Sequence, residues 1–192
     1  MKRATSGSRR SRGGHVALEM ALAFLPLMAI IFGILDFSMA IFIQGAFQNA
    51  TREAVRFGIT YNLTYNGTAY NTQTAAMTAA VQNNAFGFLS GNLSDGTTGA
   101  SKISVNYYLP NNLSTPATIA DLNLPTGVVI NGVTIKDLNA TGNVVQVSIT
   151  GYPWNWMVPL PNFMPGRSIS IGATSLDVLQ GLPVGAFNYP SP

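Results

Sequence analysis

An apolar run near the N-terminus constrains this chain more than any other feature. The 28 residues from Val16 to Ile43 contain only three strongly polar ones, Glu19, Asp36 and Ser38. About 20 apolar residues suffice for a helix to cross a bilayer. The run is about twice as long as the apolar part of a secretory signal. No small-x-small cleavage site follows roughly its first 7–15 residues, where a secretory signal would end. The sequence therefore predicts a retained membrane helix, as part of one continuous helix over residues 15–58.

A basic cluster directly precedes this run and predicts its orientation. Half of all Lys and Arg in the chain fall there, namely Lys2, Arg3, Arg9, Arg10 and Arg12. A basic cluster beside a span stays on the cytoplasmic side. We therefore expect residues 1–14 to be a cytoplasmic leader, residues 15–58 a transmembrane and stalk helix, and residues 59–192 an extracytoplasmic domain.

The remaining charge argues against several classes of function. Beyond residue 14, five Lys and Arg face seven Asp and Glu, a net charge of −2, so no basic face is left for nucleic acid. Charged residues are 9% of the chain, against about a quarter in a typical soluble protein. This composition suits a chain packed against lipid or against copies of itself. Because the chain has no Cys, disulfides and thiolate metal sites are excluded.

Hydrophobic periodicity predicts an α+β fold, with a long N-terminal helix, a shorter second helix and a small antiparallel sheet. Apolar residues at helical spacing, Phe47, Ala50, Ala54 and Phe57, share one face of the long helix, and Gly58 is the expected terminator. Pro26 is expected to kink the span. A second helix is predicted at about 72–90, after a loop over residues 59–71.

Alternation with a period of two follows from residue 101 onward and predicts a small antiparallel sheet. Asn131-Gly132 is the strongest signal for a two-residue hairpin. Residues 152–165 contain four prolines and both tryptophans, which predicts an ordered but irregular connection. The predicted strands cover residues 103–109, 128–130, 133–135, 144–150 and 168–179.

One motif carries chemistry. Gly14 ends the basic leader, His15 follows it, and Glu19 lies five residues after the glycine, at the start of the apolar helix. This is the processing pattern of type IV prepilins. Glycine permits the close backbone approach that a protease needs, and cleavage would leave a free amine at the membrane face. A Glu in the first turn of a membrane helix is costly unless it has a partner.

Three segments together resemble the TadE-like family, which comprises pseudopilin-type proteins of tight-adherence (Flp) pilus systems. They are residues 14–22, residues 32–37 after Pro26, and residues 48–56. The resemblance is strong over residues 13–58, weaker over 143–178, and rests on position alone over 60–140. It implies a minor pilin or pilus-assembly component of the bacterial inner membrane, cleaved by a prepilin peptidase. Its partners would be other pilin or pseudopilin subunits and the assembly platform.

The two acidic residues of the apolar run, Glu19 and Asp36, each have two possible roles. The resemblance implies that Glu19 pairs with the new amine of a neighbouring subunit, whereas the simpler interpretation is an interfacial carboxylate reaching the headgroups. Asp36 either marks the end of the hydrocarbon core or makes a buried contact with another helix. We therefore retain Glu19 and Asp36 as candidate assembly contacts.

No enzyme, metal or cofactor is expected. His15 is the only His, the seven acids are scattered, and Ser and Thr have no visible base. Two rivals to the pilin hypothesis remain. One is an uncleaved membrane-anchored scaffold of the same machine. The other is a surface adhesion module that uses the aromatic loop at 152–163, although Tyr152, Trp154 and Trp156 are more often core packing.

Overall fold

The computed structural model describes residues 13–117, 128–130, 133–135, 142–156 and 168–180. Residues 1–12 of the predicted leader over residues 1–14, the Asn131-Gly132 turn and residues 157–163 of the aromatic loop lie outside these residues. The elements are α1 (Gly13–Gly58), β1 (Thr64–Tyr65), β2 (Thr68–Ala69), α2 (Gln73–Asn84), the 3-10 helix η1 (Gly99–Lys102), β3 (Ile103–Tyr108), β4 (Val128–Ile130), β5 (Val133–Ile135), β6 (Val144–Asn155) and β7 (Ser168–Val178). The predicted α+β class is confirmed.

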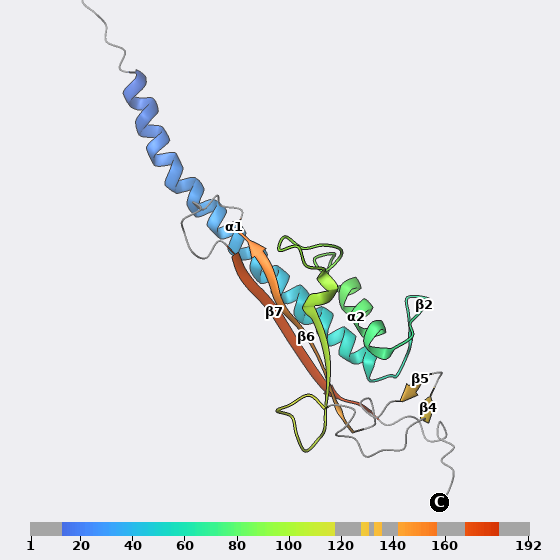
Figure 1. The fold of residues 1–192 in the computed structure, drawn as a ribbon. Helices are drawn as coiled ribbons and strands as arrows, with labels where there is room; N and C mark the ends of the chain where they lie inside the picture. Colours follow the sequence, from blue (N-terminus) through green and yellow to red (C-terminus); the bar gives the residue numbers. More distant parts are fainter. Residues whose placement is uncertain (1–12, 118–127, 131–132, 136–141, 157–167, 181–192) are drawn as a thin grey trace, which may run out of the picture.

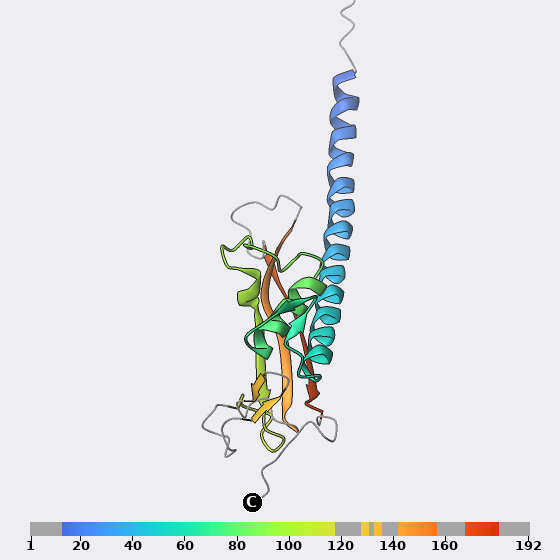
Figure 2. The ribbon, with the colours of Figure 1, turned by 90° about the vertical axis from the view of Figure 1, so that its right-hand side faces the viewer.

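Helix α1 dominates the structure. It runs without interruption for 46 residues, about 70 Å at 1.5 Å per residue, and confirms the predicted continuous helix. Its N-terminal half projects beyond every other described element, while its C-terminal half lies along β6, β7 and α2 (Figures 1 and 2). Pro26 lies within the helix, in the projecting half.

The packed half of α1 presents one continuous buried stripe. The face that we predicted from Phe47, Ala50, Ala54 and Phe57 is confirmed for the first three, which are fully buried, while Phe57 is half-buried against the core. The stripe starts earlier than the sequence indicated, because Ala40 and Ile43 are buried as well. Residues 36–43 are apolar on nearly all sides, so their pattern does not reveal which face meets the domain.

A three-stranded antiparallel sheet in the order β3-β6-β7 packs on this stripe through β6 and β7. Its register places Ile103 opposite Ile149, and Ile149 opposite Ala173. A bulge follows Ile149 and inserts one extra residue, with Gly151 in the left-handed region at φ 69°. Because side chains alternate between sheet faces, the extra residue moves Tyr152 onto the core-facing side.

The bulge also explains an incorrect prediction. We expected residues 152–165 to be irregular, but β6 continues to Asn155, with Pro153 paired to Ser170. Strand β3 pairs only with residues 144–149, so the far end of β6 is an edge on that side. A proline is tolerated there, because it interrupts no ladder between two neighbours.

The second helix is confirmed in existence but ends earlier than predicted. Thr72 caps α2 by accepting a hydrogen bond from the Ala75 amide at 3.2 Å. The helix stops at Asn84, because the chain reverses through Phe86 and Gly87, both with positive φ. The predicted loop before α2 contains a miniature hairpin, β1–β2, that turns at Asn66-Gly67.

The predicted hairpin of residues 128–135 is confirmed in its pairing. Val128 lies opposite Ile135 and Ile130 opposite Val133. The two strands form a small sheet of their own, separate from β3-β6-β7.

A buried polar chain ties the end of α1 to α2 and β3. The Gln73 amide donates to the Gly58 carbonyl, and the Tyr107 hydroxyl donates to Gln73 Oε1 at 3.1 Å. Burial raises the pKa of Tyr107 above its usual value near 10. Gly58 ends α1 where Met77 packs so closely that a Cβ would lie 2.5 Å from the Met77 Cε. The helix end is thus fixed by packing as well as by hydrogen bonds.

Removing Gln73 from the middle of this chain of hydrogen bonds should destabilise the domain. We expect Gln73→Leu to lower the free energy of unfolding by about 2 kcal/mol, because it removes the buried donor to the Gly58 carbonyl and the acceptor for the Tyr107 hydroxyl. The matched control is Gln146→Leu, which removes a half-buried bond from the Tyr108 hydroxyl at 2.8 Å and should cost less than about 1 kcal/mol. Urea unfolding of the detergent-solubilised chain measures both, and equal losses would contradict a special role for Gln73.

Candidate membrane and assembly helix

The projecting half of α1 is covered by exposed apolar side chains. Among the described residues, 15 of the 19 exposed large apolar side chains lie on α1, from Val16 to Phe42. By length and composition this helix is able to cross a membrane, and its most apolar window has no buried residue. Full burial of a large apolar side chain is worth about 1.5–3 kcal/mol, so this surface gains on the order of 20 kcal/mol in an apolar environment.

The predicted processing residues lie together at the start of this helix. Gly14 is in the first turn of α1, and His15 and Glu19 are both exposed. His15 and Glu19 are four residues apart and share a face. Helical Cα–Cβ bonds tilt toward the helix N-terminus, so the Glu19 side chain leaves the backbone on the side of the Gly14–His15 bond. The role of these residues in processing stays a prediction.

Asp36 is far from this group and has a different environment. It lies 17 residues after Glu19, about 26 Å along the axis. Its side chain is 0% exposed, at the N-terminal end of the stripe that packs on the domain. A buried carboxylate needs specific polar partners. The burial occurs within one chain, so it neither tests nor requires the predicted contact with another helix.

The domain end nearest the projecting half carries an aromatic cluster that the sequence did not reveal. Tyr152 meets Phe47 edge-on at 5.1 Å between ring centroids, and Phe88 lies 6.4 Å from Phe47 and 6.2 Å from Phe42. These rings come from α1, the segment after α2, and β6. Their separation in sequence is why periodicity within single elements gave no signal for the cluster.

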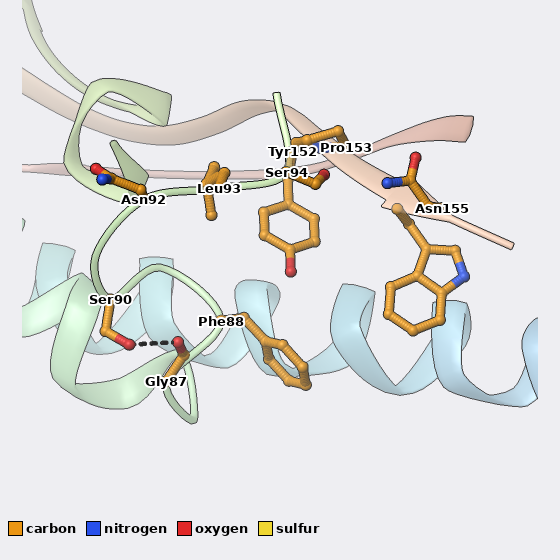
Figure 3. Close-up of a pocket in the computed structure, with 10 residues that line it drawn as sticks. Gly87, Phe88, Ser90, Asn92, Leu93, Ser94, Tyr152, Pro153 and Asn155 are labelled. Carbon is orange, nitrogen blue, oxygen red and sulfur yellow. Dashed lines mark hydrogen bonds between the residues drawn. The ribbon is translucent and has the colours of Figure 1, made fainter. Parts of the chain in front are cut away.

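A groove of about 380 Å³ opens beside this cluster. Phe88, Leu93 and Tyr152 form its apolar lining, while Ser90 and Asn155 add polar groups (Figure 3). Tyr152 is buried and Trp154 is half-buried against the core, in line with the packing interpretation of these aromatics. Among the described residues, no Asp, Glu, Lys, Arg or His side chain lines the groove.

The segment after the groove is closed by a salt bridge. Lys102 Nζ lies 2.7 Å from Asp95 Oδ2, and Thr97 donates its hydroxyl to Asp95 at 2.6 Å. The pKa of Asp95 lies well below its usual range, and the hydrogen bond from Lys102 is the largest cause. Both charges are solvent-accessible, so the pair orders the turn and leaves the groove neutral.

Among the residues that the structure describes, no group of three or more His, Asp or Glu side chains is placed to hold a metal ion. The predicted absence of metals and cofactors is not tested by this observation and stays a prediction.

Comparison with models of known protein families gives a match at the N-terminal helix. Residues 14–56 match the model of the TadE-like protein family, in agreement with the resemblance drawn from the sequence. The match covers the projecting helix and most of the stripe that packs on the domain. It suggests a Tad pilus-associated protein with an N-terminal apolar helix. No curated protein and no solved structure matches the chain.

The burial of Asp36 generates a test of how α1 is fixed to the domain. We expect Asp36→Asn to lower the free energy of unfolding by about 2–3 kcal/mol, because an amide group replaces a buried acceptor oxygen. Ser38→Ala is the matched control, since this exposed hydroxyl donates only within the helix, to the Ile34 carbonyl at 2.7 Å. Urea midpoints in detergent compare the two, and an unchanged midpoint for Asp36→Asn would show that its burial contributes nothing.

Proposed function

We propose that this chain is a non-enzymatic, pilin-like subunit for assembly or priming of a tight-adherence pilus. The observation that carries the proposal is the exposed apolar half of α1, which needs lipid before assembly and other helices afterwards. The family match over residues 14–56 supports the pilus system. Under this proposal the leader is cytoplasmic, α1 spans the inner membrane, and the α+β domain lies outside.

Processing by a prepilin peptidase would occur between Gly14 and His15. Two consecutive glycines form the first turn of α1, where each lowers helix stability by about 1 kcal/mol relative to Ala. The first turn therefore unwinds more easily than the rest of the helix. This supports the glycines as the point where a protease gains access to the backbone.

Cleavage would change the electrostatics of Glu19. The new amine of His15 adds a positive charge one turn away, on the face that carries Glu19. In a packed helix bundle, the carboxylate of one subunit would pair with the amine of the next. A charge-assisted pair in an apolar environment is stronger than the same pair in water. Assembly would thus favour arrangements in which every Glu19 has a partner.

The substitution Glu19→Ala tests this role. We expect it to leave membrane insertion intact, because it only removes a charge from an apolar helix, and to lower incorporation into surface fibres about tenfold, the effect of losing some 1.4 kcal/mol per contact. The amount of subunit in sheared fibres, relative to that in membranes, measures incorporation.

Glu53→Ala is the matched control, since Glu53 is an exposed acid on the packed half of the same helix. We expect it to leave fibre incorporation unchanged. Normal incorporation of Glu19→Ala would contradict the assembly role of Glu19. A wild-type chain that is found in membranes but never in sheared fibres would favour the alternative, a membrane-anchored scaffold.

A further inference from the structure

Two exposed aromatic rings from different elements meet where α1 leaves the domain. Phe42 on α1 is 52% exposed, and Phe86 in the turn after α2 is 69% exposed. Their ring centroids are 6.0 Å apart. The segment after α2 lies at the end of the domain from which α1 projects (Figure 2). Phe86 is therefore an apolar side chain directed outward beside the projecting helix.

The backbone holds Phe86 in an unfavourable conformation. A turn from Ala85 to Phe88 is closed by the Phe88 amide, which donates to the Ala85 carbonyl at 3.0 Å. Its central residues, Phe86 and Gly87, have φ of 51° and 83°. Turns of this kind favour Asn and Gly, and a bulky residue in the left-handed region costs about 1–2 kcal/mol.

This turn is also firmly anchored. Ala85 before it and Leu89 after it are fully buried. The Ser90 hydroxyl donates to the Gly87 carbonyl at 2.6 Å, and the Gln82 amide donates to the Leu89 carbonyl at 3.0 Å. An anchored, strained turn that displays a large apolar side chain to solvent indicates a function for that side chain.

The depth of Phe86 relative to the span follows from the exposed surface of α1. Between Met20 and Phe42 the only strongly polar residues are Asp36, which is buried, and Ser38, whose hydroxyl bonds within the helix. These 23 residues cover about 34 Å, close to the roughly 30 Å of hydrocarbon in a bilayer. Gln44 is the first exposed polar side chain beyond them.

Phe42 thus lies at the outer boundary of the span, and the neighbouring Phe86 lies at the same depth. We propose that the Phe86 turn inserts into the outer headgroup region of the bilayer that α1 crosses, so that the domain docks on the membrane surface. Residues 85–94 contain no charged residue, which suits this depth. The inference rests on the proposed function for the position of the span.

Depth measurements on single spin labels test the proposal. The chain has no Cys, so Phe86→Cys, Ile30→Cys and Leu113→Cys each give one labelled site. Each full-length variant is reconstituted into phosphatidylcholine vesicles with a minority of phosphatidylglycerol. Collision with oxygen, which concentrates in lipid, is then compared with collision with a water-soluble nickel chelate. Ile30 is the control for the span, because its exposed side chain lies in the middle of it.

Leu113 is the matched control in water. It is 61% exposed, and it follows β3 at the end of the sheet where Tyr108 pairs with Val144. That end is opposite to the one from which α1 projects (Figure 1). We expect the ratio of oxygen to nickel accessibility to be highest at Ile30 and lowest at Leu113. At Phe86 we expect it to be several-fold higher than at Leu113.

The outcomes separate the two proposals. A water-like label at Ile30 would overturn the span and with it the proposed function. A lipid-buried label at Ile30 with a Phe86 label as water-accessible as Leu113 would overturn only the docking of the turn. A Phe86 label that is immobilised but shielded from oxygen would also overturn only the docking of the turn, because the Phe86 turn would then contact protein instead of lipid.

A second variant removes the Phe86 side chain, which is the proposed anchor, while it keeps the backbone conformation of the turn. Asn tolerates the left-handed conformation, so Phe86→Asn should keep the turn folded and leave the urea midpoint unchanged or raised. A spin label at the exposed Asn92 then reports the position of the segment. We expect this label to shift toward water-like accessibility in the Phe86→Asn background. An unchanged label at Asn92 would contradict the role of Phe86 as the anchor.

Discussion

The contact between the Ala-rich stripe of α1 and the β3-β6-β7 sheet is the interaction on which the rest of the structure depends. Small buried side chains such as Ala40, Ala50 and Ala54 let α1 approach the elements packed on it closely, and the larger Ile43 and Phe47 are fully buried in the same core. Among the described residues, Asp36 is the first fully buried side chain of α1. One half of α1 therefore packs in a protein core, while the other half exposes an apolar surface.

This division gives the proposed function its physical basis. An exposed apolar helix is stable either in lipid or against other helices, so a subunit can pass from one to the other at little cost, because lipid tails are as apolar as the side chains. Direction must then come from the few polar groups. The amine created at His15 and the carboxylate of Glu19 would supply it, whereas Asp36 is already enclosed by its own chain.

Much of this arrangement follows from the sequence, and the misses have identifiable causes. The long helix and the strands at 128–130 and 133–135 were predicted correctly, because each has a strong local pattern. Asn66-Gly67 carries the same hairpin signal as Asn131-Gly132, but its two-residue strands show no alternation. The extension of β6 past Thr150 was missed because a bulge changes the alternation. The exposure of Phe86 depends on contacts between distant segments, which no local pattern records.

Cleavage after Gly14 is the most direct test of the account. The measurement is the intact mass and N-terminal sequence of the chain, taken from membranes of the native host and from its sheared surface fraction. The account predicts a mature chain that starts at His15 and is present in both fractions. A chain that still starts at Met1 and is confined to the membrane would contradict it, because no new amine would exist to pair with Glu19.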